Sequence, residues 1–209
     1  MADKTSILPG PEGQLEAIVQ IQSQTGPSAI ICHPHPLYGG TMHNKVVYTL
    51  ARLYESHGFN TVRFNFRGVG KSSGQYDEGR GEREDLCAVA AWLQTQSSGV
   101  IHLAGFSFGA YVAASEAANL QASSLVSVAP PVERLYFGEI TPPEAPWIVV
   151  QPMADEVVSP EAVLAWFADL QHAQKYLIQI PEASHFFHGK LIELRDALEA
   201  KLQHLGIFV

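Results

Sequence analysis

Short β-rich runs alternate with helical patterns along the whole chain, and this alternation limits what the sequence can fold into. The expected strands are Ala17 to Gln22, Ser28 to Cys32, Asn60 to Phe64, Ile101 to Ala104, Leu125 to Val128, Trp147 to Gln151 and Tyr176 to Ile180. The expected helices are Asn44 to Ser56, Glu82 to Gln94, Phe108 to Asn119, Pro160 to Leu170 and Leu191 to Leu205. Strands that alternate with helices are typical of parallel βαβ construction. We therefore expect an α/β fold, with a mostly parallel central sheet flanked by helices on both faces.

Apolar residues in two of these helices recur at helical spacing. One stripe consists of Val46, Val47, Leu50, Leu53 and Tyr54, and the other of Leu86, Val89, Ala90 and Leu93. Such stripes indicate core-facing positions rather than functional ones. The chain has 209 residues, a length that one hydrophobic core can serve, and the proline-rich stretch from Ala129 to Pro146 is interpreted as a loop. We expect a single domain over residues 1–209.

The charge balance argues against two classes of partner. Thirteen Lys and Arg against 21 Asp and Glu give a net charge of −8, which would repel phosphate backbones and anionic lipid surfaces.

No apolar run approaches the roughly 20 residues of a membrane-spanning helix. The segment Met1 to Ser6 lacks the basic region and apolar stretch of a secretion signal. We therefore expect a cytoplasmic protein without a nucleic-acid or membrane partner.

Cys32 and Cys87 are the two cysteines of the chain. They are too few for a disulfide framework, and nothing pairs them at metal-ligand spacing. Free cysteines are commonly buried in protein cores. We expect two free, buried thiols.

The sequence Gly-Phe-Ser-Phe-Gly at positions 105–109 carries the clearest chemical signal. It directly follows the strand Ile101 to Ala104 and precedes a helix of small residues, the arrangement of a nucleophile elbow. A serine in this strained turn needs glycine two positions away on each side, because a side chain there would clash with the strand or helix. We predict that Ser107 is a nucleophile. We also predict that the backbone N–H of Phe108, at the start of the helix, stabilises an oxyanion.

Two later loops offer the base and the acid that a nucleophilic serine needs. An imidazole takes the hydroxyl proton and a carboxylate orients the imidazole, in the chain order Ser, acid, His. Asp155 follows the strand Trp147 to Gln151, with Glu156 beside it as the alternative acid. His185 follows the last expected strand, with His188 as the alternative base. We predict Asp155 and His185.

The segment His-Pro-His-Pro-Leu-Tyr-Gly-Gly at positions 33–40 is expected to give a second oxyanion donor. Its prolines have no N–H, so the backbones of His35 and Leu37 are the candidates. Closely spaced histidines also suggest a metal site, but a proline separates His33 from His35 and no carboxylate completes a ligand set. We expect no metal and no cofactor.

Together these segments resemble the α/β-hydrolase superfamily. The resemblance rests on positions 33–40, on Arg-Gly-Val-Gly-Lys-Ser-Ser-Gly at 67–74, on the elbow around Ser107, and on Asp155 and His185. More narrowly, positions 33–40 and their continuation through 44–47 resemble short bacterial hydrolases related to dienelactone hydrolases and prolyl-oligopeptidase-like esterases. The resemblance spans nearly the whole chain. It implies the α/β-hydrolase fold and esterase-type activity on small acyl substrates.

Larger members of this superfamily commonly insert a lid where this chain has only Ala129 to Pro146. We therefore expect a minimal lid or none, and a nucleophile open to solvent. Tyr38, Tyr136 and Phe137 are candidates to shape a substrate pocket, although aromatic residues in a loop can equally serve as packing anchors.

The segment at 67–74 also resembles a phosphate-binding glycine loop. It lacks the Lys-Ser/Thr spacing of a P-loop, so we interpret it as a structural turn. Contact of Arg67 or Lys71 with a substrate carboxylate is the alternative interpretation.

The leading hypothesis is a carboxylesterase-like serine hydrolase that cleaves a small carboxylic ester or thioester through an acyl-enzyme. One alternative is a catalytically idle protein of the same fold that binds a small ligand. Another is a non-hydrolytic use of the same residues, as in lyases or perhydrolases, because a fold alone does not fix the chemistry. The presence of Ser107, Asp155 and His185 together favours catalysis over the idle alternative.

Overall fold

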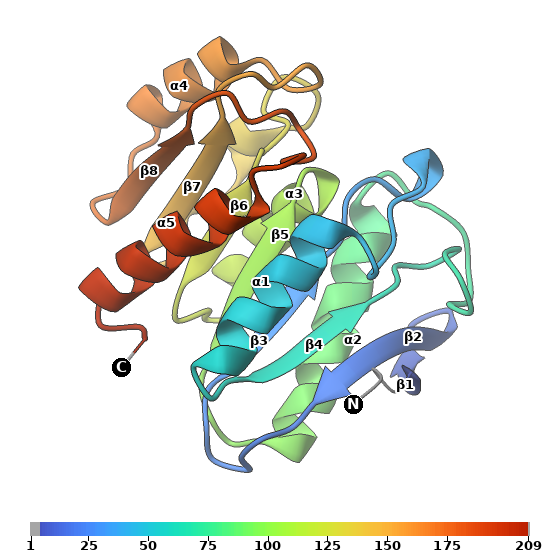
Figure 1. Cartoon of the computed structure of the whole chain (residues 1–209). Coiled ribbons are helices and arrows are strands. Elements are labelled where there is room, and N and C mark those ends of the chain that lie inside the picture. Colours follow the sequence, from blue (N-terminus) through green and yellow to red (C-terminus); the bar gives the residue numbers. More distant parts are fainter. Residues whose placement is uncertain (1–4, 209) are drawn as a thin grey trace.

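The computed structural model describes residues 5–208, and within this range eight strands form one sheet (Figure 1). The strands are β1 (Thr5–Gly10), β2 (Gly13–Gln20), β3 (Ser28–Cys32), β4 (Asn60–Phe64), β5 (Ile101–Phe106), β6 (Leu125–Val128), β7 (Trp147–Pro152) and β8 (Lys175–Ile180). Their spatial order is β1-β2-β4-β3-β5-β6-β7-β8. The β1–β2 and β2–β4 pairs are antiparallel, and every other pair is parallel. The expected mostly parallel sheet is confirmed.

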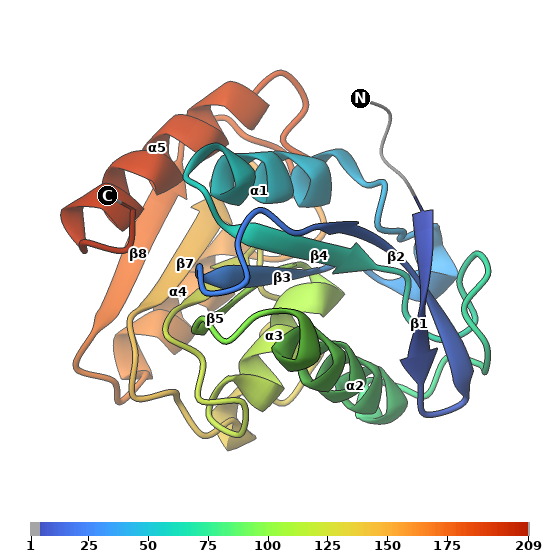
Figure 2. The ribbon, with the colours of Figure 1, turned by 90° about the horizontal axis from the view of Figure 1, so that it is seen from below.

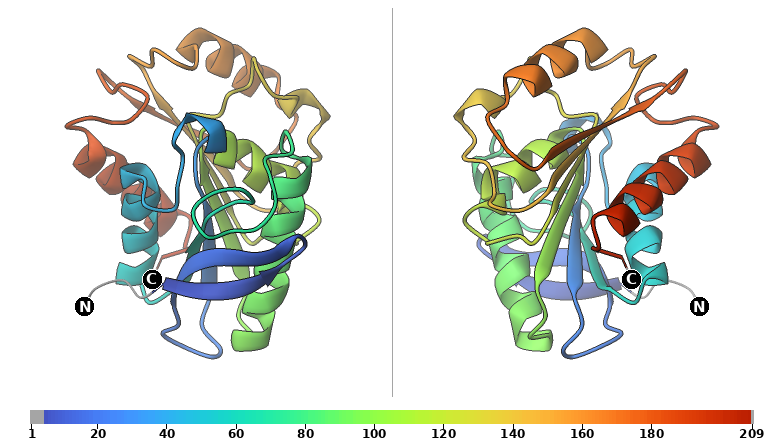
Figure 3. Two further views of the ribbon diagram at one scale, coloured as in Figure 1. Left: turned by 90° about the vertical axis from the view of Figure 1, so that its right-hand side faces the viewer. Right: turned by 90° about the vertical axis from the view of Figure 1, so that its left-hand side faces the viewer.

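Five α-helices cover the two faces of the sheet. They are α1 (Lys45–Ser56), α2 (Arg80–Gln96), α3 (Phe108–Ala117), α4 (Pro160–Asp169) and α5 (Leu191–His204), and the short 3₁₀ turns are η1 (Pro36–Tyr38) and η2 (Phe137–Glu139). Helices α1 and α5 share one hydrophobic cluster, and α2, α3 and α4 share another. Figures 2 and 3 show these two helix layers on opposite sides of the sheet. The α/β-hydrolase fold implied by the sequence is confirmed.

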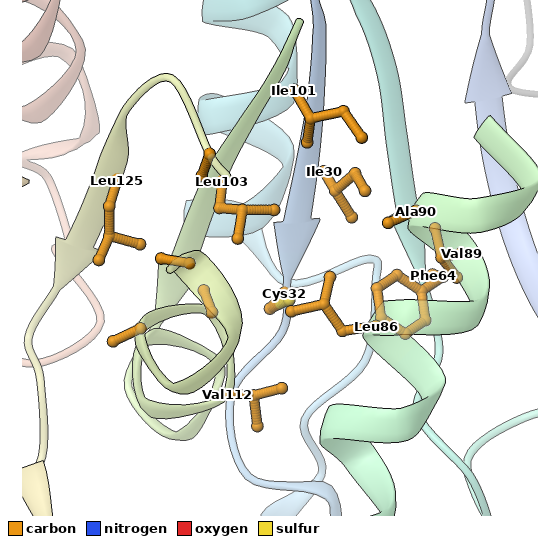
Figure 4. Packing of buried hydrophobic residues seen from close by; sticks show 14 of the residues in the cluster. Ile30, Cys32, Phe64, Leu86, Val89, Ala90, Ile101, Leu103, Val112 and Leu125 are labelled. Atoms are coloured by element: carbon orange, nitrogen blue, oxygen red, sulfur yellow. The ribbon is translucent and has the colours of Figure 1, made fainter. Parts of the chain in front are cut away.

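The apolar stripes recognised in the sequence are the faces by which the helices contact the sheet. The first stripe is buried on α1, whose N-terminus is capped by the Asn44 carboxamide accepting hydrogen bonds from the N–H groups of Val46 and Val47. The second stripe is buried on α2. Figure 4 shows the hydrophobic cluster shared by α2, α3 and α4 at close range, with Leu86, Val89, Ala90, Val112, Ile30, Cys32, Phe64 and Leu103 among its members.

The antiparallel edge of the sheet differs from expectation. Of the edge strand expected at Ala17 to Gln22, the part up to Gln20 belongs to β2, which begins at Gly13 and pairs on both sides. The edge strand is β1, which the sequence analysis missed because only Leu8 of its six residues is buried, leaving no alternating apolar pattern to recognise. Pro9 fits there, since an edge strand can leave one row of N–H positions without a partner.

The structure also bears on the expectations for the cysteines and for membrane-spanning helices. Cys32 and Cys87 are both free, but Cys87 is only partly buried. Across residues 5–208, no helix is long and apolar enough to cross a lipid bilayer.

Candidate active site

Ser107 lies at the sharp turn between β5 and α3. Its backbone has φ 55° and ψ −120°, a conformation that costs a residue with a side chain roughly 1–3 kcal/mol. A Cβ atom added to Gly105 would collide with the carbonyl oxygen of Gly109, and one added to Gly109 would collide with that of Cys32. The requirement for glycine on both sides of the serine, argued from the sequence, is therefore confirmed.

Hydrogen bonds hold both ends of the turn. The N–H of Ser107 donates to the carbonyl oxygen of Val128 on β6 at 2.9 Å, and its own carbonyl accepts from the N–H of Ala110 at 2.8 Å. The serine is therefore fixed to the neighbouring strand and to the first turn of α3.

His185 connects Ser107 to Asp155. Its Nε2 lies 3.1 Å from the Ser107 hydroxyl oxygen, and its Nδ1 lies 2.8 Å from Oδ2 of Asp155. Because a carboxylate can only accept here, the imidazole carries its proton on Nδ1 and presents an unprotonated Nε2 to the serine. The structure thus brings together the three residues selected from the sequence.

The Asp155 carboxylate is held on its other oxygen as well. Oδ1 accepts hydrogen bonds from the N–H groups of Val157 and Val158, both at 2.8 Å. The Asp155 side chain has no exposed surface, and the His185 side chain is 3% exposed. The carboxylate is therefore fixed in orientation and shielded from water, as a group that orients an imidazole must be.

The two alternative residues lie elsewhere. Glu156 is exposed, and its Oε2 accepts a hydrogen bond of 3.1 Å from the backbone N–H of His185 rather than from the ring. His188 is exposed and its ring contacts Phe186, at a centroid separation of 6.1 Å. Glu156 thus fixes the backbone of the histidine whose ring Asp155 holds.

The backbone around residue 35 distinguishes the two oxyanion candidates left open by the sequence. The N–H of Leu37 already donates to Nδ1 of His35 at 3.3 Å. In the described part of the chain, the N–H groups of His35 and Phe108 take part in no hydrogen bond. These two N–H groups are therefore available to an oxyanion, and that of Leu37 is not.

The loop that carries His35 is fixed by contacts the sequence did not indicate. Nε2 of His35 lies 3.2 Å from the Tyr76 hydroxyl, and its ring packs on those of Tyr38 and Phe108. Gly40 closes the loop by donating its N–H to the carbonyl oxygen of His35 at 3.0 Å. Tyr76 comes from the segment between β4 and α2, 41 residues away, so no local pattern could identify it.

His33 has a structural place rather than a metal-binding one. Its Nδ1 donates to the carbonyl oxygen of Pro34 at 2.6 Å, and its Nε2 accepts from the N–H of Phe66 at 3.0 Å. Burial lowers the pKa of His33 from its ordinary 6.5 to about 4. The ring is therefore neutral near pH 7 and joins the ends of β3 and β4 beneath the loop of His35.

A cavity of about 290 Å³ opens over the serine. Its lining consists of Pro34, His35, Tyr38, Gly39, Gly40, Asn44, Ser107, Arg134, Val157, His185 and Phe186. Ser107 is 9% exposed, so the expected solvent-open nucleophile is corrected to one that is reached through this cavity.

Of the three aromatic residues expected to shape the pocket, one lies at the cavity. Tyr38 lines it. Phe137 is instead buried in the core against Tyr111 and Trp166, and Tyr136 is exposed beside a different hollow. Phe137 is therefore a packing anchor, because it begins η2 and its ring packs onto α3 and α4, away from the cavity over Ser107.

The segment at 67–74 forms a structural turn, as interpreted. The Arg67 side chain is 5% exposed, and its guanidinium contacts Oδ1 of Asp85 on α2 at 2.8 Å. The backbone N–H of Lys71 donates to Oε2 of Glu16 at 3.0 Å. Neither Arg67 nor Lys71 lines the cavity, so the alternative that either meets a substrate carboxylate there is wrong.

Comparison with known proteins supplies a family and several relatives. The family model for X-Pro dipeptidyl-peptidase (S15 family) matches residues 16–136, a range that includes Ser107 and the loop of His35 but ends before Asp155 and His185. An uncharacterized protein from Rickettsia prowazekii (strain Madrid E) is 34% identical over 90% of this chain and 84% of its own.

Two solved structures match nearly the whole chain. XC6422 from Xanthomonas campestris, an α/β serine hydrolase without a lid, is 44% identical, covers 97% of this chain and 94% of its own, and superposes with a TM-score of 0.91. An α/β serine hydrolase homologue from Coxiella burnetii is 48% identical, with coverages of 97% and 98% and a TM-score of 0.90.

The neutral state of His33 predicts a loss of stability in mild acid. Below pH 6.5 the unfolded chain binds a proton at this residue that the folded chain does not bind until about pH 4. Stability from His33 is thus complete above pH 6.5 and falls by about 3 kcal/mol as the pH approaches 4. Urea unfolding between pH 7.5 and 4.5 should show a shallower pH dependence for His33→Asn than for the wild type. The exposed His43→Asn is the control, and equal slopes for all three proteins would contradict the assignment.

Proposed function

Because the chain belongs to the X-Pro dipeptidyl-peptidase (S15) family of the α/β-hydrolase superfamily, we propose that it is a serine hydrolase that cleaves small carboxylic esters or thioesters. The observation that carries the proposal is the hydrogen-bonded series from Ser107 through His185 to Asp155. In an idle binding protein of this fold, nothing would require that series to be kept.

The geometry supports a two-step acyl transfer. Nε2 of His185 takes the hydroxyl proton as Ser107 Oγ attacks the carbonyl carbon, and the protonated imidazole is stabilised by Asp155. The same proton then passes to the departing alcohol or thiol, which leaves an acyl group on the serine oxygen. Water attacks this acyl-enzyme and gives a proton to His185. The bond between the acyl carbon and Ser107 Oγ then breaks, His185 returns the proton to Oγ, and the acid product leaves.

The negative charge on the attacked carbonyl oxygen needs donors that are already in place. The free N–H groups of Phe108 and His35 are the proposed oxyanion hole. Phe108 is the first residue of α3, where the positive end of the helix dipole adds to the effect. Loss of one such donor typically costs a factor of about 100 to 1,000 in turnover.

An ester substrate suits this cavity better than the amino terminus of a peptide. A dipeptidyl-peptidase must hold the free ammonium group of its substrate, for which a carboxylate is the natural partner. None of the described residues that line the cavity is acidic, and Arg134 adds a positive charge. We therefore propose an esterase-type specificity in spite of the peptidase description of the family.

Three expectations from the sequence remain predictions. These are the cytoplasmic location, the single-domain organisation over residues 1–209 and the independence from any cofactor. Lyase or perhydrolase activity with the same residues would be distinguished from hydrolysis by the products formed.

Replacing the nucleophile should abolish turnover. We expect Ser107→Ala to lower kcat for p-nitrophenyl acetate by a factor of about 10⁴ or more, because the residues act as a unit and only binding and the oxyanion hole remain. Labelling by a fluorophosphonate probe should also disappear, while circular dichroism stays that of the wild type. The wild type should leave Ala-Pro-p-nitroanilide uncleaved. Persistent labelling of the Ser107→Ala variant would contradict the proposal. Rapid cleavage of the anilide by the wild type would show that the substrate is a peptide rather than an ester.

The two neighbouring acids should differ strongly in their effect. Asp155→Asn replaces the acceptor on Nδ1 of His185 and favours the wrong tautomer, so kcat should fall by a factor of about 10³ to 10⁴. Glu156→Gln keeps an oxygen that can accept from the His185 backbone, so we expect less than a tenfold loss. Steady-state kinetics on p-nitrophenyl acetate measures both, and a greater loss for Glu156→Gln would reverse the assignment.

The size of the cavity predicts a preference for short acyl chains. In a volume of about 290 Å³, methylene groups beyond the first few stay in water and gain little of the roughly 0.8 kcal/mol that burial of each would provide. We expect kcat/KM to level off or fall from p-nitrophenyl butyrate to octanoate and palmitate. The rate should not rise when an emulsion forms, since no lid has to be displaced. A steady increase toward palmitate would contradict this prediction.

A further inference from the structure

The cavity over Ser107 contains an arginine that the proposed reaction does not use. Arg134 lies in the segment between β6 and η2 and is exposed. Its side chain lines the same cavity as Ser107 and His185. Among the described lining residues it is the side chain with a permanent charge, because the others are apolar, neutral polar or histidine.

Arg134 also differs from most other arginines of the chain in lacking a carboxylate partner. Ion pairs join Arg52 to Glu55, Arg67 to Asp85, Arg80 to Asp77, Arg83 to Glu116 and Arg195 to Asp196. Over residues 5–208, the Arg134 guanidinium forms neither an ion pair nor a hydrogen bond. In a protein of net charge −8, a cation left without a partner at the cavity is free to meet an anion brought by a ligand.

The neighbouring polar groups in the cavity are donors too. The carboxamide oxygen of Asn44 is occupied by the N–H groups of Val46 and Val47, which leaves its NH₂ group to donate. Asn44 and Ser107 are the N-cap residues of α1 and α3, so the positive ends of two helix dipoles face this region. An anionic group would therefore meet an arginine and further donors, with no lining carboxylate among the described residues to repel it.

We propose that Arg134 determines specificity for substrates that carry a carboxylate beside the scissile ester. The guanidinium binds that carboxylate, while Phe186, Val157 and Tyr38 contact the carbon skeleton. This inference rests on the proposed hydrolase function, because it identifies the class of substrate for the same cavity. Arg134 acts by binding, so its contribution should be visible mainly in KM.

Matched esters test this assignment on each side of the scissile bond. On the acyl side, p-nitrophenyl hydrogen glutarate is compared with its neutral methyl ester. On the alcohol side, 4-acetoxybenzoate is compared with methyl 4-acetoxybenzoate. For each pair, kcat/KM for the anionic ester is divided by kcat/KM for the neutral ester. An effect of a substitution on the chemical step changes both values equally and cancels in this ratio.

For the ester pair whose carboxylate faces Arg134, the Arg134→Gln substitution should lower this ratio about tenfold. The reason is that a charge-assisted contact at a partly exposed site is lost. Arg134→Lys should retain part of the ratio, since it keeps the charge but not the planar fork. Arg52→Gln, which removes an exposed arginine on α1 outside the cavity, should leave the ratio unchanged. Raising NaCl to 1 M should reduce the advantage of the wild type over Arg134→Gln.

The outcomes separate this inference from the function on which it rests. Ser107-dependent hydrolysis of the neutral esters by the wild type and both Arg134 variants supports the hydrolase function. If the anionic-to-neutral ratio is then the same for Arg134→Gln and the wild type in both pairs, the specificity role of Arg134 is overturned. If the wild type hydrolyses none of the esters, the proposed function is wrong and the inference is overturned with it.

Discussion

The strained backbone of Ser107 is the constraint on which the rest of the site depends. A positive φ places the hydroxyl above the carboxyl end of β5 and leaves the Phe108 N–H unbonded at the start of α3. The close approach of α3 to β3 and β5, possible only with Gly105 and Gly109, prevents this turn from relaxing. The cost of the unusual conformation is offset by the buried packing of α3 between its neighbours, where the helix has almost no exposed surface on its inner side.

Around this fixed serine, two loops are held by paired contacts from adjacent residues. Asp155 holds the ring of His185 and Glu156 holds its backbone, so the position and the orientation of the imidazole are set from one stretch of chain. On the other side, His33 joins β3 to β4, and His35 is held by Tyr76. Each histidine in these loops therefore serves a different purpose, which is decided by its hydrogen-bond partners.

The parts of this structure that were predictable from the sequence are those encoded by local pattern. The strand, turn and helix around Ser107 are contiguous, and the stripes on α1 and α2 repeat within one helix. β1 was missed because its single buried residue leaves no apolar pattern, although it pairs with the adjacent β2. Features that depend on distant contacts were also missed or misplaced. Tyr76 contacts a loop 41 residues away, and Phe137 turns into the core because η2 packs on α3 and α4. The sequence shows the chemical type of each of these residues, but it does not show which residues they contact in the folded chain.

The distance along the chain between the reacting residues has a consequence for biosynthesis. Ser107 and His185 are 78 residues apart, and the histidine follows β8, the strand at the far edge of the sheet. During synthesis, a chain that has folded only as far as β6 holds the strained serine without a base. Non-local contacts of this kind form late in folding, because long loops must close before the contacts are gained. By the proposed hydrolase mechanism, the chain would therefore acquire reactivity only when its last strand is in place and His185 can reach Ser107.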